Sequence, residues 1–208
     1  MGKLVTTRKY LRSSLAVLLQ ALTCLYTIPF SFFTRIAVSK PKNFVVPSGT
    51  LIISNHQSKS DPFLIIRFLG FANFIRNAPT RFPTIHSFMD IPILGQFLWS
   101  IYCFKVGEST MERAHALIQM RDILRLRKTI LLFPEGRRIR IGNEVEIFHK
   151  GIDMLLAKDF SILLVRLRNF NDWRLFGYGK RASITFEIMP ENLSTEQKRS
   201  YITDFYAS

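Results

Sequence analysis

Acidic residues and cysteines are scarce in this chain of 208 residues. It contains 15 Asp and Glu against 29 Lys and Arg, which gives a formal net charge of +14, and no acidic residue precedes Asp61. The two cysteines, Cys24 and Cys103, lie in apolar runs and form no C-x-x-C pair. This usage excludes a disulfide framework and a cysteine metal site, and it indicates buried free thiols in a reducing compartment. The excess positive charge calls for an anionic partner: nucleic acid, a phospholipid surface or a phosphorylated substrate.

Nucleic acid is the least suitable of these partners, because the chain lacks any helix-turn-helix, RNP or zinc pattern. Its aromatic residues are mostly Phe, with 19 against 6 Tyr and 2 Trp, and its mean hydropathy of +0.13 is high for a soluble protein. Both features favour a lipid surface. His86, His115 and His149 have no metal-ligand spacing with one another. We therefore predict no nucleic-acid partner and no metal.

An apolar stretch of about membrane-spanning length covers residues 14–34. Basic residues flank it on both sides, so charge gives no direction of insertion, and no small-residue cleavage site follows it as in a signal peptide. Gln20, Thr23 and Pro29 interrupt it. The favoured interpretation is a helix, kinked or broken near Pro29, that lies in or dips into one leaflet. A full membrane span and an ordinary buried helix are the alternatives.

The rest of the chain alternates between strand-like and helix-like segments. Strands are predicted over residues 50–54, 73–76, 101–106, 129–133, 160–167 and 181–188. Helices are predicted over residues 62–69, 110–126, 148–157 and a short segment after 194, the second of them opened by a capping box. We therefore predict an α/β fold in which a mixed sheet is covered by helices. Residues 1–45 would form a membrane-associated helical segment with its linker, and residues 46–208 the main domain.

A histidine and an aspartate lie in the loop between the first strand and the first helix of this domain. The apolar run 51–53 leads into Asn55-His56, and Asp61-Pro62 opens the next apolar run. Four residues separate His56 from Asp61, enough for a tight loop in which the carboxylate holds the imidazole as a general base. Alternatively, Asp61 caps the helix and His56 is an ordinary loop residue. The two interpretations are compatible, because a carboxylate has two oxygens.

A second polar segment, Glu135-Gly136-Arg137-Arg138, follows the apolar strand predicted over residues 129–133. The ends of strands in parallel sheets are where α/β proteins bind ligands. Arginine donates paired hydrogen bonds to phosphate, and glycine lets the backbone approach a ligand closely. The segment therefore indicates a phosphate-binding position, with a solvated surface turn as the alternative.

From about residue 51 to 167, more than half of the chain, these motifs resemble those of the 1-acyl-glycerol-3-phosphate acyltransferase family. The motif Asn55-His56-x4-Asp61 is similar to the family's Asn-His-x4-Asp. The later motif Phe133-Pro134-Glu135-Gly136-x-Arg138 is similar to its Phe-Pro-Glu-Gly-Thr-Arg. Two further segments, Ile91-Pro92-x-x-Gly95 and Phe148-x-Lys150-Gly151, also resemble family motifs in the expected order.

The chain departs from the family pattern at three positions. Arg137 stands where Thr is usual, and Leu164 stands where the last strand normally carries Pro. Glu108 occupies the position of an Arg that the family is thought to use for the acceptor's phosphate. Lys105 is the nearest basic substitute, and Arg76 and Arg81 are other options. The loss of that Arg leaves open a different lysolipid acceptor.

The resemblance implies a membrane-associated enzyme with its catalytic domain on the cytoplasmic side. It would move a fatty acyl group from acyl-CoA or acyl-carrier protein to the free hydroxyl of a lysophospholipid, foremost 1-acyl-glycerol-3-phosphate to give phosphatidic acid. His56 would act as general base with Asp61 orienting it. The implied substrate-binding residues are Asn55, Glu135, Gly136, Arg137, Arg138 and Lys105. The acyl donor is a co-substrate, so no cofactor is implied. A non-catalytic lipid-binding protein on the same fold is the rival.

Residues 91–104 are apolar except for Gln96 and Ser100, and at this length they are too short to span a bilayer. One interpretation is a buried core helix that leads into the strand predicted over 101–106. The other is a helix that lines a tunnel for an acyl chain or touches the bilayer.

Overall fold

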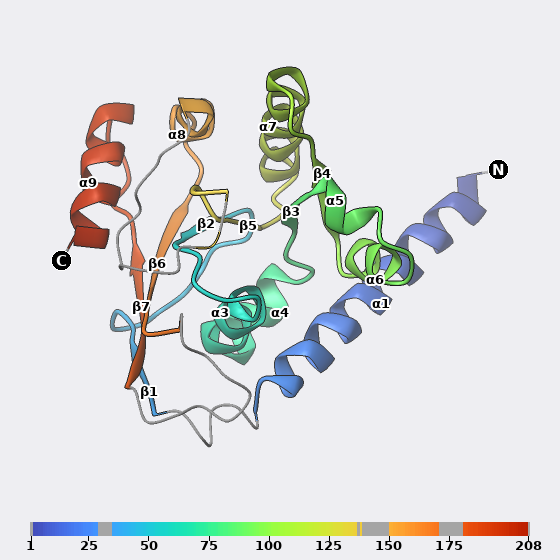
Figure 1. Cartoon of the computed structure of the whole chain (residues 1–208), viewed down its shortest axis with the longest axis horizontal. Helices are drawn as coiled ribbons and strands as arrows, with labels where there is room; N and C mark the ends of the chain where they lie inside the picture. The colour runs from blue at the N-terminus through green and yellow to red at the C-terminus, as the bar shows by residue number, and fades with distance from the viewer. Residues whose placement is uncertain (1, 29–34, 137, 139–149, 171–180, 208) are drawn as a thin grey trace.

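The computed structural model describes residues 2–28, 35–136, 138, 150–170 and 181–207 (Figure 1). Its main sheet has five strands in the order β1 (Ile36–Ser39), β7 (Ala182–Ile188), β6 (Ile162–Arg168), β2 (Leu51–Ser54) and β5 (Ile130–Leu132). Neighbouring strands are parallel except β6 and β7, which are antiparallel. The predicted mixed α/β sheet is therefore confirmed.

Two further strands extend this sheet beyond β5. β3 (Phe82–Ile85) and β4 (Cys103–Val106) pair in parallel, and a parallel bridge joins Arg81 to Ile130. The bridge consists of the Arg81 N–H donating to the Thr129 carbonyl at 3.0 Å and the Leu131 N–H donating to the Arg81 carbonyl at 2.9 Å. β2, β3, β5 and β6 therefore run in one direction, and their carboxyl ends lie at one edge of the sheet, called here the carboxyl edge.

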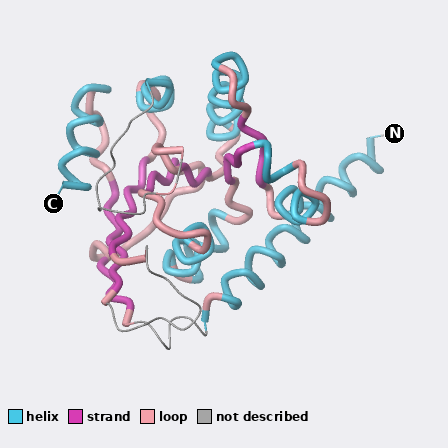
Figure 2. The backbone as a smooth tube through the Cα atoms, viewed as in Figure 1, coloured by secondary structure: helices cyan, strands magenta, loops and turns pink. Residues whose placement is uncertain are grey.

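Helices cover both faces of the sheet, as Figures 1 and 2 show. One face carries α1 (Gly2–Tyr26), α3 (Asp61–Leu69) and α4 (Phe71–Asn77), and the other carries α7 (Thr110–Arg125), α8 (Asp153–Leu156) and α9 (Thr195–Ala207). A 3-10 turn, Lys150–Ile152, precedes α8, and α5 (His86–Met89) and α6 (Leu94–Ser100) connect β3 to β4. The helices after 110, 150 and 194 confirm the sequence prediction.

Strand β2 lies at the centre because both of its faces are apolar. All four of its residues are buried, and Ile52 joins the core beneath α3 while Leu51 and Ile53 join the core beneath α7, α8 and α9. A continuous apolar run without alternation is typical of a parallel strand covered on both sides. The sequence signal that placed a strand at 50–54 is therefore also the reason for its central position.

Two helix starts test the capping predictions. At α7 the capping box is confirmed: the Glu112 N–H donates to Ser109 Oγ at 3.2 Å, and the Ser109 N–H donates to Glu112 Oε2 at 3.1 Å. At α3 the predicted cap is wrong by one residue, because Ser60 is the N-cap and Asp61 is already helical. The Asp61 side chain turns back toward the loop before the helix instead of capping it.

The predicted strand over residues 73–76 is wrong, since these residues belong to helix α4. Two buried asparagines explain the outcome. Asn73 Oδ1 accepts from the Val46 N–H at 2.9 Å, and Asn77 Nδ2 donates to the Val46 carbonyl at 3.1 Å. These long-range bonds fix a short helix whose local sequence gives little helical signal. Strands β1 and β3 were not predicted either; both are four residues long.

Residues 91–104 form helix α6 followed by strand β4, which confirms the helix–strand order but not the burial. Only Gly95 of α6 is buried, while Leu94, Phe97 and Trp99 are exposed. The buried core helix is therefore wrong. Gly95 does permit a close approach, because a Cβ there would lie 2.0 Å from the Met89 carbonyl oxygen.

Helix α1 begins well before residue 14 and ends at Tyr26, so the predicted break near Pro29 falls outside the described residues. Its polar Gln20 is fully buried. Gln20 Nε2 donates to the carbonyls of Thr80 at 2.7 Å and Ile101 at 2.9 Å, and its Oε1 accepts from the Thr80 N–H at 3.0 Å. Across the described ranges, no helix combines the length and hydropathy needed to cross a bilayer.

Candidate active site

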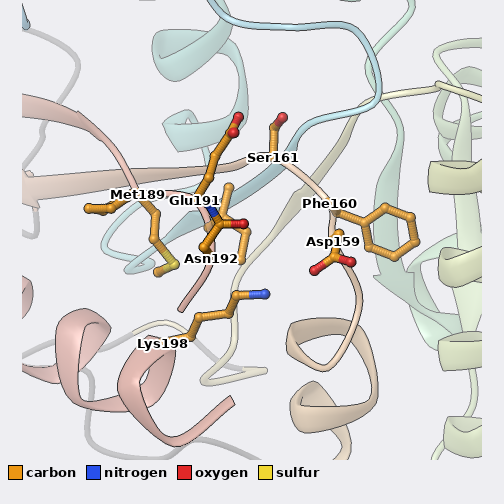
Figure 3. Close-up of a pocket in the computed structure, with 9 residues that line it drawn as sticks. Asp159, Phe160, Ser161, Met189, Glu191, Asn192 and Lys198 are labelled. Carbon is orange, nitrogen blue, oxygen red and sulfur yellow. The ribbon is translucent and has the colours of Figure 1, made fainter. Parts of the chain in front are cut away.

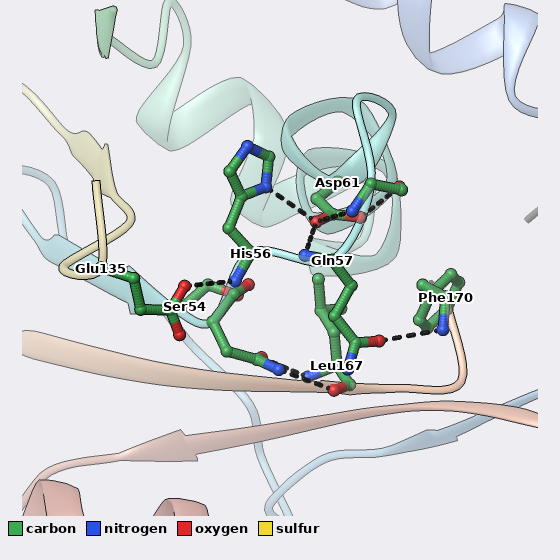
Figure 4. A network of polar contacts seen from close by, with 9 residues as sticks. Ser54, His56, Gln57, Asp61, Glu135, Leu167 and Phe170 are labelled. Carbon is green, nitrogen blue, oxygen red and sulfur yellow. Dashed lines mark hydrogen bonds and ion pairs between the residues drawn. The ribbon is translucent and has the colours of Figure 1, made fainter. Parts of the chain in front are cut away.

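The loop after β2 brings the predicted pair together at the carboxyl edge of the sheet (Figure 4). His56 Nδ1 lies 2.9 Å from Asp61 Oδ2. The Asp61 side chain is fully buried, and the His56 side chain is 21% exposed. One nitrogen of the ring is thus held from inside the protein while the ring itself stays accessible, which is the arrangement a general base requires.

Asp61 is held by more than the histidine. Its Oδ2 also accepts from the backbone N–H groups of Gln57 at 2.6 Å and Ser58 at 2.7 Å, and its Oδ1 accepts from the Ser58 hydroxyl. These donors compensate the burial of the carboxylate. Because Oδ2 can only accept, His56 Nδ1 carries the proton, which leaves Nε2 as the nitrogen with a lone pair.

Strand β6 anchors both residues that flank the histidine. Asn55 Nδ2 donates to the Leu167 carbonyl at 2.8 Å, and Asn55 Oδ1 accepts from the Leu167 N–H at 2.7 Å. Gln57 Oε1 accepts from the Phe170 N–H at 2.9 Å. Asn55 is almost fully buried, so its amide positions the loop through the backbone of β6. The substrate-binding role implied for Asn55 stays a prediction.

Glu135 comes to the same loop from the end of β5. The His56 N–H donates to Glu135 Oε2 at 2.9 Å, and Glu135 is buried. The ring of Phe133 stacks on the His56 ring with centroids 4.2 Å apart. Gly136 has a φ of +63°, a backbone conformation that glycine adopts without a steric penalty. The two motifs predicted from the sequence are therefore in direct contact.

Tyr206 of α9 binds the strands that lead to the His56 loop. Its hydroxyl donates to the carbonyls of Ile53 at 2.9 Å and Val165 at 3.1 Å. Burial raises the pKa of this hydroxyl well above its usual value, and the negative charge of Glu135 raises it further. Tyr206 therefore remains a neutral hydrogen-bond donor that joins α9 to the two strands on which the loop rests.

The predicted basic residues are less closely gathered. Arg138 follows the β5 loop and is exposed, and Arg137 lies outside the described residues. Lys105 is exposed and pairs with Asp90, whose pKa is lowered first by this hydrogen bond. Glu108 Oε1 lies 3.8 Å from His86 Nδ1 at the end of β4. The described structure thus joins Glu135 to His56. Lys105, predicted to bind the substrate, pairs with Asp90 instead.

Gln57 and Tyr206 hold the site as well, and Arg168 follows Leu167, whose backbone binds Asn55. The sequence did not identify these three as site residues. Arg168 ends β6 directly after Leu167, and its Nε is buried with no hydrogen-bond partner in the described part of the chain. Two arginines at alternating positions near the end of an apolar strand, Arg166 and Arg168, were the available signal. In a strand such residues point to the same face.

A separate hollow of about 180 Å³ lies at the opposite edge of the sheet (Figure 3). It is lined by residues at the start of β6 and the end of β7, together with Lys198 of α9. Lys198 Nζ donates to the carbonyls of Leu156 at 2.9 Å and Lys158 at 3.2 Å. In the ranges that the structure covers, no group of three or more His, Cys, Asp or Glu could hold a metal ion.

Comparison with known proteins identifies the family of the chain. A family model described as Acyltransferase matches residues 35–165, more than half of the chain. The chain belongs to the acyltransferase family. The predicted family is thereby confirmed, and both contacting motifs around His56 and Glu135 fall within the matched range.

Two relatives carry more specific names. The chain is 29% identical over 141 residues to a 1-acyl-sn-glycerol-3-phosphate acyltransferase of Borreliella burgdorferi, a match that covers 67% of this chain and 53% of that protein. The chain thus spans about half the length of this curated relative. The crystal structure of the 1-acyl-sn-glycerophosphate acyltransferase PlsC of Thermotoga maritima superimposes with a TM-score of 0.69, at 18% identity, over 96% of this chain and 79% of that one. This acyltransferase therefore shares the fold of that crystal structure.

Proposed function

We propose that this acyltransferase moves a fatty acyl group from a thioester donor, acyl-CoA or acyl-carrier protein, to the free hydroxyl of a lysophospholipid. The proposed acceptor is 1-acyl-glycerol-3-phosphate, and the product is phosphatidic acid. The observation that carries the proposal is the His56–Asp61 pair, with Nδ1 held at 2.9 Å and Nε2 left to receive a proton. The names of the two relatives support the choice of acceptor.

The proposed reaction uses His56 twice. Nε2 takes the proton of the acceptor hydroxyl, and the oxygen attacks the carbonyl carbon of the thioester. The tetrahedral intermediate collapses with loss of the carbon–sulfur bond, and the protonated Nε2 returns the proton to the thiolate. Positioned proton transfer of this kind contributes about 10²- to 10⁴-fold to a rate, and the alignment of two bound substrates contributes more. Asp61 stabilises the imidazolium between the two transfers.

The acceptor's phosphate is proposed to lie between Arg138 and Arg168. β2, which leads into His56, lies between β5 and β6 in the sheet. Arg168 is the last residue of β6, and Arg138 comes after β5. Arg168 brings a buried Nε with no partner among the described residues, and a guanidinium group suits phosphate. Arg137 and Lys105 are further candidates from the sequence, and Glu135 orients the loop through the His56 N–H.

A bilayer is proposed as the surface on which the enzyme works, with the catalytic domain on its cytoplasmic side. From residue 13 onward, α1 exposes four leucines at helical spacing, Leu15, Leu18, Leu22 and Leu25, each at least half exposed. An apolar stripe on a helix flanked by basic residues is typical of interfacial binding, and the net charge of +14 favours anionic lipid. The absence of acidic residues before Asp61 adds to this preference.

The deciding experiment measures transfer of labelled oleate from oleoyl-CoA to a panel of lysophospholipids. Wild type should acylate 1-acyl-glycerol-3-phosphate, and His56→Ala should lose at least about 10³-fold in kcat. His115→Ala is the matched control, because His115 is exposed on α7, and it should retain activity. Transfer by His56→Ala at the wild-type rate would contradict the base assignment.

Two other outcomes would redirect the proposal. Transfer only to a different lysolipid would mean that Glu108, in place of the expected arginine, marks a changed headgroup specificity. Silence on the whole panel, repeated with acyl-carrier protein as donor, would favour the non-catalytic lipid-binding protein. Because the His56 pair and its anchors are intact in the structure, we expect neither.

A further inference from the structure

The connection between β3 and β4 exposes an unusual amount of apolar surface. Ile93 is 81% exposed and Trp99 is 51% exposed, and Phe88, Ile91, Leu94 and Phe97 are also exposed. A helix in such a connection normally buries its apolar face against the sheet. Here α6 buries only Gly95. Met89 and Leu98 pack against the core, and the six exposed side chains form a surface called here the crossover patch: Phe88, Ile91, Ile93, Leu94, Phe97 and Trp99.

The backbone at Ile93, the most exposed of these side chains, has a strained conformation. Ile93 has φ +68° and ψ −56°, and the Leu94 N–H donates to the Pro92 carbonyl at 2.7 Å. This is a γ-turn of the strained form with positive φ, which is rare for any residue and poorly suited to a β-branched one. Glycine would adopt it more easily. Strained backbone is typical of functional positions, and at an exposed isoleucine it points to a contact outside the fold.

The crossover patch begins at the edge of the sheet that carries the active site. β3 runs parallel to β5 and β2, so α5 and the turn at Ile93 begin at the carboxyl edge, where the His56 loop also lies. The far end of the patch is joined to α1, since Gln20 binds the carbonyl of Ile101 just beyond α6. Figure 1 shows α6 alongside α1. The patch thus extends from the edge that carries the site toward α1.

We infer that the crossover patch is a second bilayer-binding surface, which sits in the interfacial layer of an anionic phospholipid membrane next to the active site. The inference rests on the proposed function, because a lysophospholipid acceptor has to pass from the bilayer to His56. Trp and Phe suit the membrane interface. Two copies with a net charge of +14 each repel one another, whereas an anionic bilayer attracts each copy.

Trp99 provides a direct probe, because the chain contains only 2 Trp. In Trp173→Phe, Trp99 is the single tryptophan. We expect vesicles of phosphatidylcholine and phosphatidylglycerol with brominated acyl chains to quench its fluorescence and shift it to shorter wavelength. The matched control places a tryptophan at Leu126 of the α7 end, also highly exposed, with both natural tryptophans changed to Phe. That probe should stay unquenched. An unquenched Trp99 in vesicle-bound protein would overturn the inference.

A second variant gives two effects of opposite sign. Ile93→Gly removes the exposed side chain and relieves the backbone, so it should raise Tm while it weakens vesicle binding about tenfold or more. The control, Leu126→Gly, removes a similar exposed surface and should leave vesicle binding unchanged. Equal vesicle binding by wild type and Ile93→Gly would overturn the inference. Concentration-dependent dimers in sedimentation equilibrium, abolished by Ile93→Gly, would assign the patch to a second copy instead.

The two proposals can fail separately. Acyl transfer by wild type to 1-acyl-glycerol-3-phosphate in detergent micelles needs no bilayer, so it tests the proposed function without vesicle binding. No transfer by wild type in micelles would reject the proposed function. Transfer in micelles together with an unquenched Trp99 on vesicles would reject only the crossover patch as a bilayer-binding surface.

Discussion

At the scale of single residues, the site depends on which groups bind the two carboxylate oxygens of Asp61. Oδ2 of Asp61 meets His56 and two backbone N–H groups, and Oδ1 meets the Ser58 hydroxyl. Both oxygens therefore act only as acceptors. An amide in the same place would turn a donor toward at least one of these groups, and donors do not satisfy one another.

Asp61→Asn should therefore lower kcat/KM for acyl transfer by about 10³- to 10⁴-fold, because the imidazole loses both its correct tautomer and its charge partner. The protein should also melt at a lower temperature, since a buried donor is left unpaired. Steady-state kinetics and thermal unfolding measure the two effects. Asp90→Asn is the control, as Asp90 is exposed and pairs with Lys105. An Asp61→Asn enzyme within tenfold of wild type would contradict the proposed role.

The thiols allow a prediction that depends on pH. Burial raises the pKa of Cys24 and Cys103 from 9.0 to about 11, so the reactive thiolate forms only at higher pH than in an exposed cysteine. At pH 8 the folded protein should react with Ellman's reagent at least about a hundredfold more slowly than the protein in urea, and the folded rate should rise as the pH approaches 11. Rapid labelling of both thiols at pH 8 would contradict this.

The residues that the sequence identified are those whose partners are close in the chain or belong to a strong motif. His56 and Asp61 are five residues apart, and their contact was predictable from the loop between them. The anchors were not predictable. Asn55 reaches Leu167 over 112 residues, and Tyr206 reaches Ile53 over 153. A single sequence contains no signal for pairs at such separation, because sheet order decides them.

At the scale of elements, long apolar or capped segments were predicted well and short ones were not. β2, β6, β7 and α7 have clear patterns. In contrast, α4 has seven residues and β3 has four, too few for a period to be recognised. Their conformation is set by neighbours, as the bonds from Asn73 and Asn77 to Val46 show. For α6 the sequence left two interpretations open, a buried core helix and a helix that lines a tunnel or touches the bilayer, because composition cannot distinguish a core helix from one with an external apolar partner.

Gln20 is the polar residue that gives α1 its place. In the sequence it interrupts the apolar stretch. In the structure its side chain makes three hydrogen bonds to the backbone next to β3 and β4, which hold α1 against these strands. Gln20→Leu keeps the volume but leaves buried polar groups of Thr80 and Ile101 unpaired. We expect a loss of about 2–4 kcal/mol in unfolding free energy, measured by urea denaturation. Leu18→Gln, at an exposed position of the same helix, should cost little.

At the scale of the whole molecule, charge and apolar surface act together. The net charge of +14 attracts anionic lipid over distances of about a Debye length, and this attraction weakens with salt. Vesicle co-sedimentation should therefore fall several-fold between about 50 and 300 mM NaCl, and the fall should be smaller on pure phosphatidylcholine. His56→Ala should bind vesicles like wild type. Binding independent of both salt and lipid charge would show that electrostatics contributes little.

The pairing of β1 with β7 also orders events during synthesis. Among the described strands, β1 has β7 as its one neighbour in the sheet, and the two lie near opposite ends of the chain. While the ribosome extends the chain, β1 must wait until β7 has been made before it finds this partner. Helix α1, which precedes β1, emerges earlier still. If the proposed bilayer surface is correct, the leucine stripe can meet lipid before the sheet exists, so the nascent chain binds the membrane before its active site has formed.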